Sequence, residues 1–101
     1  MDLVNAIAKV RFASASPQRV SLHRGRSLTI DMLCMESGQE VRVHGGEWAY
    51  YIVAGVATVS AGGQAVQVPM GQLAATGDDE PHAISNAGED RVVCLAFGKP
   101  A

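Results

Sequence analysis

Short runs of apolar or alternating residues, separated by glycine-rich turns, are the feature that most constrains the fold of this chain. From Arg19 onward such runs follow one another closely, with turns at Gly45-Gly46, Gly62-Gly63 and Met70-Gly71. A Gly-Gly pair favours a tight hairpin because a type I′ turn needs positive φ at both central residues. The pattern predicts roughly eight to ten strands and an all-β sandwich or barrel.

The organisation along the chain suggests one domain. The run SLTIDMLCM is apolar on both faces, which is typical of a central strand between two layers. Apolar positions within Leu3 to Phe12 predict a short N-terminal helix, with a strand as the alternative. We therefore expect a single domain over residues 1–101, with an N-terminal arm at 1–18 and a β-barrel at 19–98.

Charge and cysteine content limit the classes of partner and the compartment. A net charge of −2 gives no general attraction to nucleic acid. No apolar run reaches the roughly 18 residues that span a bilayer, and no basic segment precedes an apolar core at the N-terminus. We expect a cytoplasmic protein with no membrane or nucleic-acid partner, in which Cys34 and Cys94 are buried thiols.

Basic residues are concentrated in the first quarter of the chain. Five of them precede residue 27, with Asp2 as the only acid in that stretch: Lys9, Arg11, Arg19, Arg24 and Arg26. The simplest interpretation is a solvated basic face. The alternative is a basic arm that meets an acidic neighbouring subunit.

The stretch GQEVRVHGGEWAYYIVAG places one histidine at a strand end, opposite aromatic residues across a tight turn. Gly38 is followed after five residues by His44, which resembles the opening of the first motif of the cupin family. The family's second histidine falls on Gly46. Its glutamate falls on Trp48, with Glu47 one place early, and the loop between them is shortened. The first motif is therefore degenerate.

The second cupin motif is better matched. Gly71, His82 and Asn86 stand at the family's spacing, while its Pro and Gly positions hold Gly77 and Asp79. The resemblance covers about residues 19 to 98. It implies a small single-domain cupin, a jelly-roll barrel that forms a double-stranded β-helix.

The resemblance also implies a metal site, which cupins build from three histidines and a glutamate. This chain keeps His44 and His82, and strand alternation turns Glu47, the candidate third ligand, away from the side that Trp48 faces. Two imidazoles hold a divalent ion weakly. The ligand set thus argues against a tightly held metal, and one Fe, Ni, Mn or Zn ion held by these three residues is the alternative.

The same positions predict a ligand pocket. We expect His44, His82, Trp48 and Tyr50 to line one cavity, on the geometry of the resembling fold. Arg42 is two residues from His44 and would face the same side of the strand. It is therefore a candidate contact for an anionic ligand at the mouth of the cavity. Trp48 would serve either as core or as a stacking wall.

Three functions follow as hypotheses. The first is a small cupin that binds a small molecule, with no assigned activity. The second is a metal-dependent cupin enzyme of the dioxygenase, isomerase or lyase type that uses His44 and His82. The third is a non-catalytic sensor or assembly domain. Because cupins commonly pair through an edge strand, we expect a homodimer.

Overall fold

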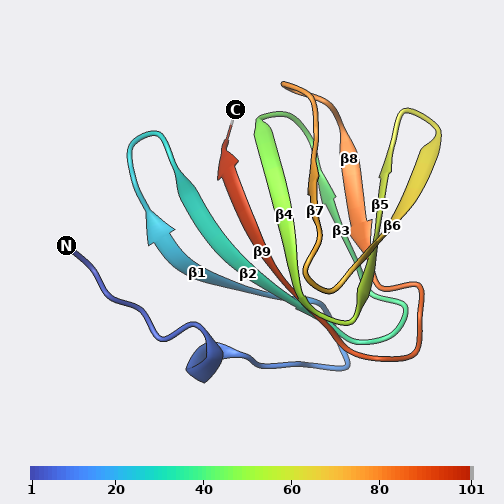
Figure 1. Ribbon diagram of the computed structural model, residues 1–101, viewed down its shortest axis with the longest axis horizontal. Helices are drawn as coiled ribbons and strands as arrows, with labels where there is room; N and C mark the ends of the chain where they lie inside the picture. Colours follow the sequence, from blue (N-terminus) through green and yellow to red (C-terminus); the bar gives the residue numbers. More distant parts are fainter. Residues whose placement is uncertain (101) are drawn as a thin grey trace.

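Nine strands in two antiparallel sheets make up the computed structural model, which describes residues 1–100 (Figure 1). Sheet A has the order β1-β2-β9-β4-β7, and sheet B has the order β3-β8-β5-β6. In Figure 1 the strands of the two sheets fan apart toward the top of the view. The elements are η1 (Ile7–Lys9), β1 (Gln18–Arg24), β2 (Thr29–Met35), β3 (Glu40–Val43), β4 (Glu47–Ala54), β5 (Val56–Ala61), β6 (Gln64–Pro69), β7 (Leu73–Ala75), β8 (His82–Ser85) and β9 (Val92–Lys99). The predicted all-β fold is confirmed.

Strand β4 shows the alternation that the sequence predicted. Trp48 and Tyr50 are buried, whereas Glu47 and Tyr51 are exposed. Successive side chains of a strand point to opposite faces, so one set enters the space between the sheets and the other faces outward. Glu47 consequently points away from the interior that Trp48 helps to fill.

Sheet A is packed on both faces. Leu33 and Cys94 belong to the main core between the sheets, whereas Met32 and Cys34 face outward and pack with Phe12 of the N-terminal segment. This two-sided burial explains why five of the seven positions of β2 are apolar. Both cysteines are free, and burial raises the pKa of the Cys94 thiol from 9.0 to about 12. Cys94 is therefore a protonated core residue.

The N-terminal helix is confirmed but is much shorter than the Leu3 to Phe12 window. It is one 3-10 turn, η1, with no buried residue and with Ala6, which cannot cap through its side chain, at the N-cap. The Asn5 side chain accepts one hydrogen bond, from the Ala8 amide at 3.2 Å. Leu3 and Ile7 are 99% and 80% exposed. A helix this short gains too little from its own hydrogen bonds to extend without a packed face. Within residues 1–100, no helix is long and apolar enough to cross a membrane.

Two glycine turns set the connections around β5. Gly62 and Gly63 both have positive φ, 58° and 79°, as the predicted type I′ hairpin requires. Gly55, between β4 and β5, has φ 80°, and a Cβ there would lie 2.4 Å from the carbonyl oxygen of Arg91. The chain thus changes sheets at a point where the backbone of Arg91, just before β9, leaves no room for a side chain.

We predict that Gly55→Ala destabilises the protein more than Gly62→Ala does. Both changes place a Cβ at positive φ, which costs about 1–2 kcal/mol. Only Gly55→Ala adds a steric overlap, for which we expect roughly 1–3 kcal/mol more. Urea unfolding of the two variants measures the difference, and equal losses of stability would contradict the steric argument.

Candidate functional site

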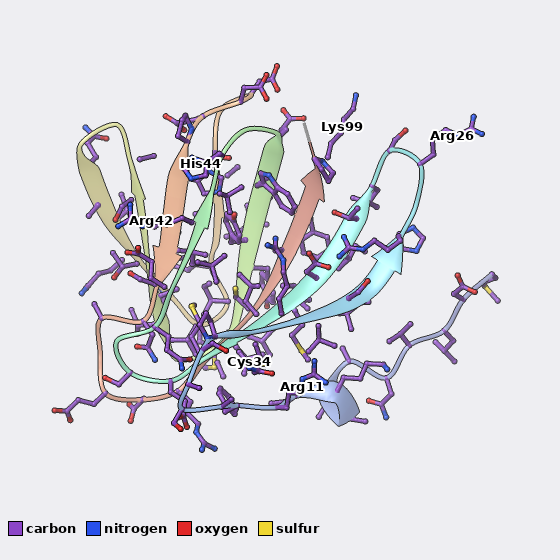
Figure 2. The ribbon with its side chains drawn as sticks, turned by 180° about the vertical axis from the view of Figure 1, so that it is seen from behind. Arg11, Arg26, Cys34, Arg42, His44 and Lys99 are labelled. Atoms are coloured by element: carbon purple, nitrogen blue, oxygen red, sulfur yellow. The ribbon has the colours of Figure 1, made fainter. Side chains whose placement is uncertain are left out.

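The structure divides the predicted ligand residues between two faces of sheet B. Val43 is paired with His82, and both are buried on the inner face. Arg42 and His44 flank Val43 in sequence, and both are exposed on the outer side (Figure 2). His44 and His82 nevertheless border one groove, which Trp48 and Tyr50 do not line. His44 lies just past the end of β3 and points the same way as the outward residues of that strand.

On the outer side, Arg42 and His44 border a groove over sheet B. The groove has a volume of about 430 Å³ and is also lined by Glu40, Gln64, His82 and the residues around Gly62. Arg42 is engaged there by Glu40, with 2.7 Å between Nε and the carboxylate oxygen. The Arg42 side chain is 74% exposed, so this ion pair adds little to stability.

On the inner side, His82 is hydrogen-bonded through both ring nitrogens. Its Nδ1 lies 2.8 Å from the carbonyl oxygen of Glu80, and its Nε2 lies 2.5 Å from the hydroxyl oxygen of Tyr50. A carbonyl oxygen only accepts, so Nδ1 carries the proton in the neutral ring and Nε2 accepts from the Tyr50 hydroxyl. The two rings meet edge to face with centroids 5.4 Å apart.

The Tyr50 hydroxyl is held in its protonated form by its surroundings. Tyr50 is fully buried, and burial raises the pKa of its phenol, which the nearby positive charge of Arg19 lowers in part. The phenol is therefore a hydrogen-bond donor toward His82. Tyr50 and His82 form one rigid pair that joins sheet A to sheet B.

A buried carboxylate on the facing part of sheet A was missed by the sequence reasoning. Asp31 is 1% exposed, and its Oδ2 accepts a hydrogen bond of 2.9 Å from Nε of Arg19. Its Oδ1 lies 3.2 Å from Arg24, close enough for an ion pair, but no donor meets it with hydrogen-bond geometry. A single acid within the apolar run of β2 was the available signal. For the two arginines, the sequence alone favours a solvated basic face.

Trp48 occupies a crowded position beside the Arg19 guanidinium that binds this carboxylate. Its indole nitrogen donates to the carbonyl oxygen of Gly45 at 3.1 Å, and the Arg19 guanidinium lies 5.6 Å from the ring centroid. A Cβ on Gly98 would lie 2.1 Å from the indole, so glycine on β9 is what allows the ring to fit. A pocket of about 370 Å³ lies on the outer side of this end of sheet A, where Trp48 borders it together with the outward-facing Glu47 and with Phe97 and Lys99.

The acidic loop before His82 is tied to the β3–β4 turn. Asp79 accepts a 2.8 Å hydrogen bond from the Gly46 amide through Oδ1, and its own amide donates to the Gly46 carbonyl oxygen. Among residues 1–100, Asp79 is the non-glycine residue with positive φ, 54°, and it stands where the resembling motif has glycine. Its carboxylate thus has a structural role close to His82.

These residues do not fit the three-histidine-and-glutamate set. In the part of the chain that the structure describes, no three His, Cys, Asp or Glu side chains form a group that could hold a metal ion. His44 and Glu47 face outward, and the inward nitrogen of His82 is occupied by Tyr50. We therefore derive no chemistry through a metal.

We predict that Tyr50→Phe lowers the free energy of unfolding by about 1–3 kcal/mol, because it leaves Nε2 of His82 buried without a donor. Tyr51→Phe is the matched control, since Tyr51 is its 39% exposed neighbour on the outer face. We expect that control to change stability by less than about 0.5 kcal/mol. Equal effects in chemical denaturation would show that the Tyr50–His82 bond contributes nothing.

Comparison with solved structures shows the same architecture. TT1209 from Thermus thermophilus is 19% identical, with a TM-score of 0.91 over 99% of this chain and 98% of that one. A conserved protein with a double-stranded β-helix domain from Klebsiella pneumoniae is 19% identical, with a TM-score of 0.86 over 99% and 90%. An RmlC-like cupin protein from Desulfovibrio desulfuricans is 22% identical, with a TM-score of 0.81 over 100% and 99%.

Comparison with sequence families agrees with the structural likeness. None of the curated proteins matches the sequence. The Cupin domain family, Cupin_2, matches residues 32–98, which run from within β2 to the last residue but one of β9 and contain both motifs. This chain belongs to the cupin family.

Proposed function

We propose that this cupin binds a small molecule at the polar end of its barrel, defined by Asp31, Trp48, Tyr50 and His82. The observation that carries the proposal is a set of buried polar side chains, drawn from both sheets, inside an otherwise apolar core. Two of these residues border surface pockets: Trp48 borders one of about 370 Å³ and His82 borders the groove of about 430 Å³. Both volumes are of the size that small ligands occupy.

The energetic argument is that these polar groups weaken the fold on their own. A buried carboxylate loses its hydration, and one oxygen of Asp31 has no hydrogen-bond donor in return. Apolar residues of similar volume would often be neutral or stabilising at such a position. A ligand that supplies the missing hydrogen bonds would explain why the chain keeps these buried polar residues.

Binding, and not catalysis, is the function we propose. The enzyme alternative needs a metal held by His44, His82 and Glu47, and two of these three residues face outward. The free, buried cysteines favour a reducing compartment, so we include the cytoplasm in the proposal.

Trp48 provides the test, because it is the only tryptophan in the chain. We expect at least one compound in a panel of sugars, amino acids and carboxylic acids to give a saturable change in Trp48 fluorescence and a rise in melting temperature. Tyr50→Phe should weaken that binding about tenfold by disturbing His82, and Tyr51→Phe should leave it unchanged.

Two outcomes would contradict this proposal. One is a panel in which no compound changes either the fluorescence or the melting temperature. The other is untagged protein that contains stoichiometric iron, nickel, manganese or zinc and loses it in His82→Ala, which would favour the metal enzyme.

A second proposal, self-association, is favoured by the outer face of sheet A. Tyr51 and Leu73 are neighbours in register and are 39% and 58% exposed, while Leu3 of the arm is 99% exposed. Beside them the arm borders an apolar pocket that includes Ile30 and Phe97. Exposed apolar residues of this kind suit the face of a second copy, for which roughly 800 Å² per partner is typical.

We expect light scattering to give twice the 10.6 kDa of one chain. Tyr51→Glu with Leu73→Glu should produce monomers, because it places two charges in the interface. Gln64→Glu with Gln67→Glu adds the same charge on exposed β6 positions and should leave the dimer intact. A wild-type monomer at working concentration would contradict this proposal.

A further inference from the structure

Strand β1 contains a bulge that determines which of its side chains enter the barrel. Ser21 is opposite Asp31, but His23, two residues later, is opposite Ile30, so one extra residue is accommodated between them. Leu22 packs in the outer cluster, and both Leu22 and His23 border the outer pocket. These consecutive residues therefore face the same way, as a β-bulge requires.

The consequence of the bulge is that Arg24 returns to the inner face. Arg19 and Arg24 differ in parity, so a regular strand would place them on opposite faces. Instead, Arg24 is opposite Thr29 and reaches Asp31 from one side while Arg19 reaches it from the other. A bulge that re-aims a side chain is a feature of functional edges.

We infer that the Arg–Asp–Arg cluster, formed by Arg19, Asp31 and Arg24, binds the carboxylate group of a small molecule. This inference rests on the proposed ligand-binding function and adds the ligand class. The two arginines against one carboxylate leave one net positive charge. Their side chains are 40% and 57% exposed, so a ligand can reach them, whereas Asp31 is buried and serves to orient them.

Arg19 is arranged as a binding group. Within residues 1–100 it donates one hydrogen bond, from Nε to Asp31, and its terminal nitrogens have no such acceptor. Its guanidinium is fixed at both sides, by Asp31 and by the Trp48 ring 5.6 Å away. A fixed guanidinium with open terminal N–H groups matches the two oxygens of a carboxylate.

The net charge selects among anions. One carboxylate neutralises the single excess positive charge of the cluster. A phosphate dianion would leave a net negative charge beside the buried Asp31, which is costly in a poorly hydrated position. The ligand we infer is therefore a monocarboxylate whose remaining atoms lie near Trp48.

The test compares propionate with propionamide, which has nearly the same shape but no charge. The single indole N–H signal of Trp48 in the NMR spectrum reports binding. We expect propionate to shift this signal saturably, and we expect propionamide and inorganic phosphate to bind at least about tenfold more weakly, as the loss of a charge-assisted contact implies.

Three arginine variants identify the group responsible. Arg19→Lys keeps a positive charge beside Asp31 but removes the paired N–H groups of the guanidinium. Arg24→Met removes the second positive charge. Each should weaken propionate binding about tenfold. Arg26→Met removes the same charge from the tip of the same hairpin, where Arg26 points away from the barrel in Figure 2, and should leave affinity unchanged. Thermal unfolding verifies that each variant is folded.

The outcomes separate the inference from the proposed function. If propionate and propionamide bind equally well, and Tyr50→Phe weakens both to the same extent, the inferred preference for a carboxylate is wrong. The proposed small-molecule site would still stand. If Arg26→Met weakens propionate binding as much as Arg19→Lys does, the attraction comes from overall positive charge and not from the Arg–Asp–Arg cluster. That result would also overturn the inference. Failure of every compound in the panel would overturn both.

Discussion

The position of β9 between β2 and β4 is the constraint on which the interior of this barrel depends. Its inward residues are small: Ala96 lies between Asp31 and Tyr50 in register, and Gly98 lies between Thr29 and Trp48. A large side chain at Gly98 would overlap the indole. Small residues on the central strand therefore leave room for large and polar ones on both neighbours, and the polar end of the barrel exists because of that space.

Much of the fold could be predicted from the sequence because it depends on local rules. Two-residue alternation placed Trp48 and Tyr50 inside and Glu47 outside, and this is a property of any strand. Gly62-Gly63 specified its hairpin through backbone freedom alone. The spacing of Gly71, His82 and Asn86 identified the family, and the structure pairs β8 between β3 and β5 accordingly.

The candidate site was less predictable because it depends on where strands end and on contacts between strands. His44 follows the last residue of β3, and its outward direction results from that boundary. The sequence alone favours solvent-exposed positions for Arg19 and Arg24. Nothing in the local sequence indicates the β-bulge between Ser21 and His23 that turns Arg24 inward. The Tyr50–His82 bond joins residues of different sheets, which alternation along one strand cannot reveal.

The bulge in β1 has an implication for how the charge inside such a barrel changes between related sequences. The side on which Arg24 lies depends on the number of residues between Ser21 and Arg24 and not on their identity. Removing one residue from this edge strand would move a positive charge from the interior to the outer face while leaving the hairpin able to form. A length change of one residue, in a strand paired on one side only, is thus enough to remove the net positive charge around a buried acid.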